Sequence, residues 1–317
     1  MPVKMNLTAY GGTASQVVYN YVVQEIDVAT GNVLFSWNSL DHVPVTDSEY
    51  PAPANGAFDY FHGNSIALTS DGNLLISGRD VSAVYDVNRT TGAVIWTLGG
   101  KHSSFSLAPS GQQWFCYQHH ARQPAANVIT LFDDGATGPS TCANHASRAL
   151  TLTLNTTSHT ATITRDLGHN PPLHAAVIGS NQTLPNGDAL VSWGDRREMT
   201  EFNSAGKANF DASLSGATYR AFRAPWTGIP EYPPAVAASQ GAGNSVTVYA
   251  SWNGDTQVAS WQVLAGSSAS SLRPVGQPKD KTTFETKITV NTAASLVAAQ
   301  ARDRSGKVLA TSPAVPR

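Results

Sequence analysis

Apolar and polar residues alternate in short runs along most of the chain, and turn residues separate the runs. The clearest stretch is Ser65–Leu98, SIALTSDGNLLISGRDVSAVYDVNRTTGAVIWTL, with Asp-Gly, Asn-Arg and Thr-Gly turns. A period of two is typical of half-buried β-strands, and these dipeptides are typical of tight turns. No window of about 11–18 residues keeps a helical period. The pattern therefore predicts an all-β protein.

This group of strands recurs along the sequence. Ser180–Leu214 aligns with it turn for turn, so that Asp71-Gly72 matches Asn186-Gly187. Val22–Trp37 is a half copy, and Asn127–Leu167 is a stretched one. Repeats of three or four strands in about 35–50 residues are the signature of β-propeller blades. The repeats therefore predict a propeller.

The number of repeats is small for a closed propeller. About four blade equivalents precede Pro234, and the first is incomplete, whereas propellers close with roughly 4–8 blades. Either the ring is unusually small, or the chain lacks its front blades. The abrupt start inside a strand-turn-strand pattern favours missing front blades.

The pattern of the sequence changes after Pro233-Pro234. Three stretches there alternate apolar and polar residues: Ser245–Gly266, Thr286–Asn291 and Ser295–Ala301. Short strands over such a length are typical of a β-sandwich of the fibronectin type III or immunoglobulin-like kind. We therefore expect a propeller domain over 1–232 and a sandwich over 233–317. The sandwich has no cluster of histidine or acidic residues, so we expect a structural role for it.

Composition narrows the possible partners. Only 13% of residues are charged and the net charge is −2, which argues against a nucleic-acid partner. No apolar run is long enough to span a bilayer, and the first residues lack the apolar segment of a signal peptide. Four Asn-x-Ser/Thr sequons and a low lysine content nevertheless favour a secreted glycoprotein: Asn6, Asn88, Asn155 and Asn181. The sequence gives no indication of oligomeric state.

The chain has two cysteines, Cys116 and Cys142. They are either two buried free thiols or, in an oxidising compartment, one disulfide that closes a loop. No Cys-x-x-Cys is present, which argues against a structural zinc site.

Histidines recur at one place in the repeats. His62 precedes the first strand of its blade, the pair His119–His120 precedes the strand VITLFDDG, and His174 precedes the strand of the second clear copy. The first strand of a propeller blade lines the central channel, so we expect these four side chains to converge. Imidazoles near neutral pH serve as nucleophiles or acid–base groups, or ligate transition metals. The other histidines are expected at the surface or bonded to backbone: His42, His102, His145, His159 and His169.

Arginines accompany these histidines, whereas carboxylates are few. Arg122 follows the histidine pair, and Arg79 and Arg148 lie in neighbouring motifs. Asp133 and Asp134 are expected to form only the tight turn of LFDDG. Because arginine binds sulfate and phosphate in a bidentate manner, the set suits transfer of a sulfuryl or phosphoryl group. No glycine-rich phosphate loop or acidic cluster is present, so we expect no nucleotide, metal or other cofactor.

Aromatic and cationic residues alternate in TYRAFRAPWTGIP, over Thr218–Pro230. One interpretation is a segment that closes the ring and joins the last blade to the sandwich. The other is an aromatic wall for an aryl substrate, built from Tyr219, Arg220 and Trp226.

Taken together, these motifs resemble the arylsulfotransferase (ASST) family, in particular its fungal and actinobacterial branch. The matching stretches are DYFHGNSIALTSDGNLLISGRD, FCYQHHARQPAANVITLFDDG, GSNQTLPNGDALVSWGDRREMTEFNSAGK and TYRAFRAPWTGIP. They cover most of Val22–Pro230 in the right order. The resemblance implies a six-bladed propeller, an extracellular or periplasmic location, and nucleotide-independent transfer of a sulfuryl group from a phenolic sulfate ester to a phenol.

The resemblance also implies roles for individual residues. His62 matches the family's His-x-Asn histidine, His119 its Gln-His histidine, and Arg148 aligns loosely with its channel arginine. These three would stabilise the sulfuryl oxygens, and His174 or His120 would be the nucleophile, although the family's nucleophilic histidine has no clear match. Substrate contacts are expected from Asn64, Arg122, Tyr219, Arg220 and Trp226. Two alternatives stay open: a non-catalytic propeller that binds an aryl or glycan ligand, and a histidine-ligated metalloenzyme.

Overall fold

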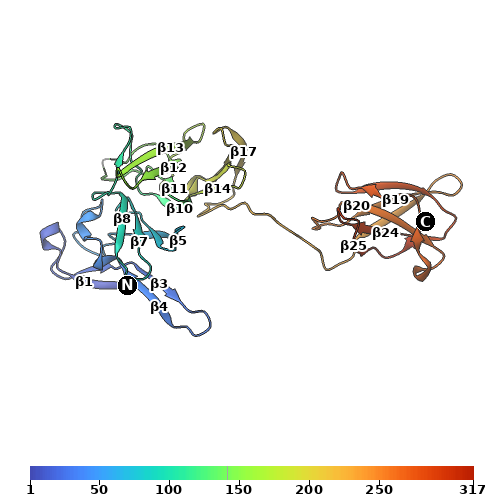
Figure 1. The fold of residues 1–317 in the computed structure, drawn as a ribbon, viewed down its shortest axis with the longest axis horizontal. Coiled ribbons are helices and arrows are strands. Elements are labelled where there is room, and N and C mark those ends of the chain that lie inside the picture. Colours follow the sequence, from blue (N-terminus) through green and yellow to red (C-terminus); the bar gives the residue numbers. More distant parts are fainter. Residues whose placement is uncertain (141) are drawn as a thin grey trace. The chain divides into compact units, whose positions relative to one another are not determined.

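The computed structural model describes residues 1–140 and 142–317, which form two compact units, Met1–Arg223 and Ala224–Arg317 (Figure 1). The predicted domain boundary after residue 232 falls inside the second unit. The regular elements of the described residues are β-strands and five single-turn 3-10 helices, so the all-β prediction is confirmed. No helix among them could cross a membrane. The 3-10 helices are η1 (Thr8–Tyr10), η2 (Ser39–Asp41), η3 (Val45–Asp47), η4 (Gly194–Arg196) and η5 (Ala269–Ser271).

Three large antiparallel sheets make up most of the first unit. In each, consecutive strands pair with one another in chain order, as in propeller blades. The first is β5 (Gly63–Leu68), β6 (Leu74–Gly78), β7 (Ala83–Val87) and β8 (Val94–Gly99). The second is β10 (His119–Ala125), β11 (Val128–Asp133), β12 (Arg148–Asn155) and β13 (Thr160–Gly168), with β9 (Ser106–Leu107) on its outer edge. The third is β14 (Ser180–Thr183), β15 (Ala189–Ser192), β16 (Glu198–Phe202) and β17 (Ala208–Ser213).

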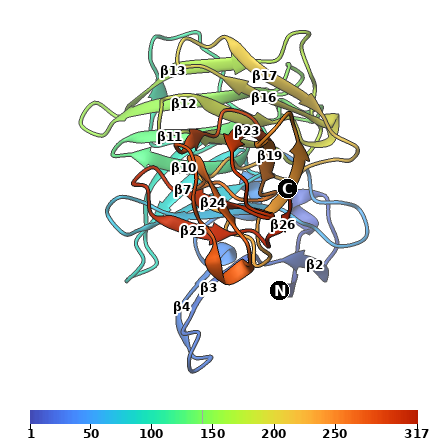
Figure 2. The same cartoon turned by 90° about the vertical axis from the view of Figure 1, so that its right-hand side faces the viewer.

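Two hairpins precede these sheets. They are β1 (Pro2–Met5) with β2 (Gln16–Tyr19), and β3 (Val22–Ile26) with β4 (Val33–Asn38). The β3–β4 hairpin repeats β7–β8, because both pairs shift register at the residue before the turn and both turns use a glycine with positive φ, Gly31 and Gly92. The half copy in the sequence is therefore a two-stranded half blade, and it projects from the body of the first unit (Figure 2).

Hydrophobic clusters join each sheet to the next. Trp37 of β4 and Ile76 of β6 share one cluster, and Leu75 of β6 and Leu131 of β11 share a second. A third contains Phe132 of β11 and Trp193, the residue after β15. Close approach at the last junction requires glycine, since a Cβ on Gly179 would lie 2.5 Å from the Phe132 ring and its φ is +127°. The first unit is therefore propeller-like, although no sheet of the described residues closes into a ring.

The second unit contains two antiparallel sheets. One is β18 (Ala235–Gln240), β19 (Ser245–Ser251) and β23 (Thr286–Asn291). The other is β20 (Ser260–Gly266), β21 (Arg273–Pro274), β22 (Lys279–Asp280), β24 (Leu296–Arg302), β25 (Val308–Thr311) and β26 (Val315–Pro316). Alternate residues of β19 and β23 are buried, and they share one hydrophobic cluster with Trp261 of β20 and Val297 of β24. The period of two in the sequence thus marks the buried face of the first sheet.

Candidate functional site

Hydrogen bonds that involve one polar side chain each connect the first strands of the three large sheets. The Asn64 amide of β5 donates to the Gln118 carbonyl beside β10, with N and O 2.7 Å apart. The Asn181 backbone N–H of β14 donates to Nδ1 of His120 over 3.3 Å. Residues at the entries of these strands are therefore neighbours, although they are far apart in sequence.

One serine in β5 and one in β14 accept equivalent hydrogen bonds from the backbone of a neighbouring segment. Ser65 Oγ accepts the Ala121 N–H over 3.1 Å, and Ser180 Oγ accepts the Ala221 N–H over 3.0 Å. Ser65 and Ser180 are equivalent in the sequence repeat, because each pairs with the matching serine of the following strand. Residues 218–223 therefore lie against β14 as β10 lies against β5.

The segment 218–223 then returns to β5. The Arg220 guanidinium donates to the Asn64 carbonyl over 2.7 Å, and the Tyr219 hydroxyl donates to the same oxygen over 3.4 Å. Four inner segments thus form a closed circuit of hydrogen bonds, although no sheet closes. Because Ala221 is equivalent to Ala121, Tyr219 and Arg220 correspond to His119 and His120 of β10.

His119 is buried and bonded to a buried acid. Its Nδ1 lies 2.6 Å from Oδ2 of Asp134, and the two side chains are 3% and 0% exposed. Tyr219 packs edge-on against the imidazole, with ring centroids 6.0 Å apart. Because Nδ1 is bonded to Asp134, Nε2 is the nitrogen that is left for a ligand.

Burial sets the protonation state of this pair. It raises the pKa of the Asp134 carboxyl well above its usual range, which favours the protonated acid beside Nδ1. Burial, followed by the positive charges of Arg79 and His62, lowers the pKa of His119 to about 3. The imidazole of His119 is therefore neutral near neutral pH, with Nδ1 engaged by Asp134.

His62 is held differently. Its Nδ1 donates to the Asp59 carboxylate over 2.7 Å, and its backbone N–H donates to the other oxygen of that group over 3.1 Å. Its φ is +48°, a left-handed conformation that this double contact supports. The bond to Asp59 raises the pKa of the His62 imidazole and fixes the proton on Nδ1. With about half of its side chain exposed, His62 presents the Nε2 lone pair when it is neutral.

Arg79 brings a cation to these histidines. Its guanidinium pairs with Asp80 at 2.6 Å, donates to the Ala176 carbonyl, and lies over the Tyr117 ring, 5.0 Å from its centroid. Its backbone N–H donates to the His62 carbonyl over 3.0 Å, and Tyr117, under its guanidinium, is two residues before His119. Arg79 is therefore the arginine that the fold places with His62 and His119.

A pocket of about 530 Å³ opens next to Arg79. Exposed His174 and the backbone of 175–177 line one side of it, and Gly135–Thr137 line the other. His174 thus lines this pocket, with Arg79 as the neighbouring charged group. The pocket is large enough for a small aromatic ligand.

The contacts of His120 argue against its predicted role as nucleophile. It is 2% exposed, and Nδ1 accepts the Asn181 N–H. Burial and the charges of Arg122 and Arg220 lower its pKa to about 3, so the imidazole is neutral with its proton on Nε2. A nitrogen that carries a proton in this way has no lone pair for attack. His120 is a donor instead.

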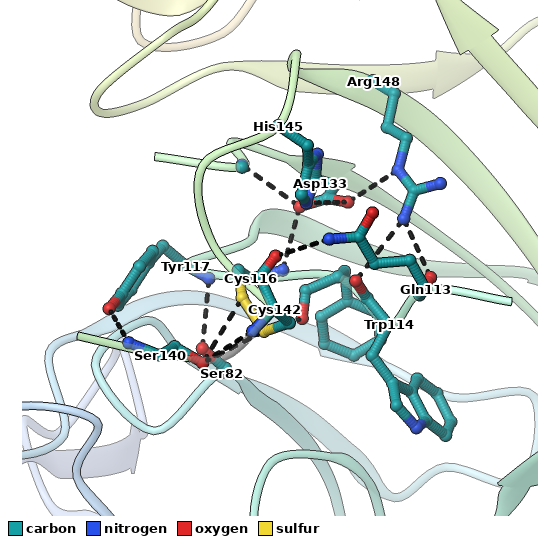
Figure 3. Close-up of a disulfide and its surroundings, with 12 residues drawn as sticks. Ser82, Gln113, Trp114, Cys116, Tyr117, Asp133, Ser140, Cys142, His145 and Arg148 are labelled. Atoms are coloured by element: carbon teal, nitrogen blue, oxygen red, sulfur yellow. Dashed lines mark hydrogen bonds and ion pairs between the residues drawn. A yellow bond between two sulfur atoms is a disulfide. The ribbon is translucent and has the colours of Figure 1, made fainter. Parts of the chain in front are cut away.

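Arg148 makes structural contacts in place of the predicted channel contacts. Its guanidinium binds the Asp133 carboxylate at 2.8 Å, the Asp166 carboxylate at 2.9 Å and the Gln113 carbonyl at 2.9 Å (Figure 3). Each of its three nitrogens is thereby engaged. The interpretation of Arg148 as a ligand for sulfuryl oxygens is therefore corrected, and its neighbour Asp133 is not merely a turn residue.

The disulfide lies in the same region. Cys116 and Cys142 are bonded, with Cα atoms 5.8 Å apart, which selects the disulfide over two free thiols. The Cys116 N–H donates to Asp133 at 2.9 Å, and Figure 3 shows Tyr117 bound to Ser82 and Ser140 beside it. The disulfide therefore anchors the segment that leads into His119.

The remaining predicted residues lie elsewhere. Trp226 belongs to the second unit and is exposed, so the site in the first unit is described without it. Asn181 is buried and its amide donates to the Leu131 and Leu150 carbonyls, which leaves this sequon inaccessible for glycosylation in the folded protein. The other five histidines make separate contacts; for example, His42 stacks on Trp37 and His102 faces Asp47.

The sequence does not reveal the acidic hydrogen-bond partners of His119 and His62, and it indicates the wrong arginine for the site. Asp134 was interpreted as part of a turn, yet it is the partner of His119, and Asp59 was not assigned to His62. Arg79 was noted only as a nearby cation. In the part of the chain that the structure describes, no three His, Cys, Asp or Glu side chains are grouped to hold a metal ion.

Comparison with protein families agrees with the motifs. The model of the arylsulfotransferase (ASST) family matches residues 1–215. This chain belongs to the arylsulfotransferase family. No curated protein matches it.

Solved structures give only distant likenesses. A protein of unknown function from Bacteroides caccae is 14% identical, with a TM-score of 0.38, over 93% of this chain and 90% of that one. Virginiamycin B lyase from Staphylococcus aureus is 10% identical, with a TM-score of 0.31, over 80% and 69%. Hydrazine synthase from Kuenenia stuttgartiensis is 10% identical, with a TM-score of 0.31, over 79% and 65%. Likenesses at this level carry no argument about activity.

Proposed function

We propose that this protein transfers a sulfuryl group from a phenolic sulfate ester to a phenol without a nucleotide donor. The observation that carries the proposal is the grouping of His62, Arg79 and His119, through the backbone bond from Arg79 to His62 and the stacking of Arg79 on Tyr117, in a chain of the arylsulfotransferase family. A cation and a neutral N–H donor suit the oxygens of a sulfate ester, and an imidazole with a free lone pair suits attack on its sulfur.

In this proposal His62 is the nucleophile. Its Nε2 attacks sulfur, the bond from sulfur to the aryl oxygen breaks, and the aryloxide leaves. The positive imidazolium that forms is stabilised by the Asp59 carboxylate at Nδ1. After the aryloxide has been released, the oxygen of a second phenol attacks sulfur, its proton passes to solvent water, and the nitrogen–sulfur bond breaks. His62 regains its lone pair, and atoms and charges balance.

His119 and Arg79 stabilise the transferring group. Arg79 and the Nε2 proton of His119 are the donors that would contact sulfuryl oxygens as negative charge moves onto the leaving oxygen. Because His119 is neutral at any pH well above 3, its donor is present across the working range. Loss of one such donor typically lowers kcat by about 100- to 1000-fold.

Turnover of 4-nitrophenyl sulfate with phenol as acceptor tests this function. We expect release of 4-nitrophenol that requires phenol, parallel lines in double-reciprocal plots, and a sulfated peptide containing His62 after rapid quenching. His62→Ala should abolish release and His119→Ala should reduce it strongly, whereas the control His102→Ala should leave it unchanged. A folded wild-type protein that binds the ester without turning it over would overturn the transferase and favour a binding protein.

The remaining features of the chain agree with action outside the cell. We infer secretion from the disulfide and the sequons, because disulfides persist in oxidising compartments. We also infer that the two sheets of the second unit form a fibronectin-like sandwich, since they share one hydrophobic cluster. The family's six-bladed ring and the fungal or actinobacterial branch stay part of the proposal.

A further inference from the structure

Two arginines at the inner edge of the first unit lack an acidic partner. Arg122 donates to the Ala121 carbonyl and Arg220 donates to the Asn64 carbonyl. Among the described residues, neither guanidinium has a carboxylate within 4.0 Å, whereas Arg79 and Arg148 both do. Both side chains are partly buried, where an unpaired cation is unfavourable.

A buried donor without an acceptor lies beside them. His120 is 2% exposed, and its Nδ1 accepts the Asn181 N–H, so its proton is on Nε2. Within the described part of the chain Nε2 of His120 has no hydrogen-bond partner, and neither does Nε of Arg220. Buried donors without acceptors are rare in native proteins and call for a ligand or an ordered water.

Hydrogen bonds bring the three groups onto adjacent segments: Arg220 donates to the Asn64 carbonyl, and the Asn64 amide donates to the carbonyl of Gln118, just before the strand that carries His120 and Arg122. The charge of Arg220 lowers the pKa of both His120 and Arg122, after the larger effect of burial. The mutual repulsion of two guanidinium groups would be relieved by an anion between them. Phe222 packs on the His120 imidazole with ring centroids 5.6 Å apart and is itself exposed, so an aryl surface borders the group.

We propose that His120, Arg122 and Arg220 form a second anion site, which binds the carboxylate of an acidic phenol while the phenol hydroxyl lies at His62 and Arg79. The assignment of the hydroxyl rests on the proposed function; the anion site itself does not. His119 and His120 are successive residues of β10, and Tyr219, which packs against the His119 imidazole, directly precedes Arg220, so the two sites are neighbours. The preferred acceptor is thus a phenol with a carboxylate on the ring, such as a hydroxybenzoate.

Binding without any sulfate donor tests the site directly. We expect isothermal titration calorimetry to show 4-hydroxybenzoate binding at least tenfold more tightly than phenol, as for hydrogen bonds to a charged group. In Arg122→Gln this preference should fall to twofold or less. The control Arg304→Gln removes the same charge from an exposed position of the second unit and should keep the full preference.

Thermal unfolding distinguishes a ligand site from a structural role. Because Arg122 has no acidic partner and faces another cation, Arg122→Gln should unfold at the same or a higher temperature than wild type. The anion site would be overturned if Arg122→Gln still binds 4-hydroxybenzoate at least tenfold more tightly than phenol. The same preference together with a lowered unfolding temperature would also overturn it, and would assign Arg122 a structural role. If the wild-type protein prefers the carboxylate but does not transfer a sulfuryl group, the transferase is refuted and the anion site is kept. If it transfers a sulfuryl group but shows no such preference, the anion site is refuted and the transferase is kept.

Discussion

His119 begins β10 and Asp134 follows the last residue of β11, so the two lie at the same end of this antiparallel pair, where Nδ1 and Oδ2 share one short hydrogen bond of 2.6 Å. Both side chains are buried, and burial lowers the pKa of His119 and raises the pKa of Asp134. Burial thus favours a pair that is neutral as a whole, in which the hydrogen bond occupies Nδ1 of His119.

Substitution of Asp134 distinguishes a protonated acid from a carboxylate. An amide N–H can donate to Nδ1 as the carboxylic acid does, so Asp134→Asn should keep the Nε2 proton of His119 and reduce kcat by less than about tenfold. Asp134→Ala leaves Nδ1 without a partner and should cost roughly 1–3 kcal/mol of stability together with most of the activity. Steady-state kinetics and urea unfolding measure both effects. Equal damage from the two variants would show that the negative charge, and not the hydrogen bond, is what matters.

The pH dependence of turnover depends on Asp59. Because its carboxylate raises the pKa of His62, the neutral nucleophile forms only as pH rises through that raised value. Asp59→Asn keeps an oxygen for the His62 backbone N–H but removes the charge. We expect the acid limb of kcat/KM to move to lower pH while the plateau falls, because the imidazolium intermediate loses its counter-charge. A profile whose acid limb does not move would exclude His62 as the titrating group.

His120 makes the first unit sensitive to acid. Its pKa is near 6.5 in the unfolded chain and about 3 in the folded protein, so between these values the unfolded state binds one more proton. Stability therefore falls as pH drops from 6.5 toward 3, by at most about 1.4 kcal/mol per pH unit. His119 contributes to this slope in the same direction and Asp134 in the opposite one, so the share of His120 is given by the change in slope on its substitution. In His120→Asn the slope should be smaller in urea unfolding at pH 6.5, 5.5 and 4.5; His102→Asn is the control.

The disulfide links stability to the site. Its loop spans 26 residues, and closure of such a loop contributes about 3 kcal/mol in the chain-entropy view. For a unit of this size, Cys116→Ala with Cys142→Ala should lower the unfolding temperature by roughly 6–12 °C. Turnover should fall as well, because Cys116 leads into His119 and holds Asp133. Calorimetry with and without dithiothreitol checks this; a reductant that lowers the unfolding temperature of the double variant as well would point to a different cause.

Much of the sheet structure could be predicted because its signals are local. Alternation over four to six residues and dipeptides such as Thr30-Gly31 and Thr91-Gly92 mark strands and turns wherever they occur. The equivalence of β5–β8 and β14–β17 follows from aligning those turns. The placement of His62 and of His119–His120 before first strands follows from the same alignment.

The partners of those histidines could not be predicted in this way. An Asp-Asp-Gly run is a turn signal, and nothing within it shows that Asp133 would bind Arg148 or that Asp134 would bind His119. Whether an arginine is free or paired depends on carboxylates from other strands, which local sequence does not show. For this reason the sequence indicates Arg148 for the site and does not indicate Arg79. A useful signal was available, since an acid that ends the strand after a histidine pair is well placed to meet that pair.

The hydrogen bond between Arg220 and the Asn64 carbonyl spans 156 positions of sequence. Contacts of such separation form late, because a long loop must close before they are made. During synthesis, when the N-terminal strands emerge and fold first, the circuit of inner segments stays open until residues 218–223 have left the ribosome. In each nascent chain His120 and Arg122 would thus wait for Arg220, so the proposed anion site would be completed only after β10 and its neighbouring strands have formed.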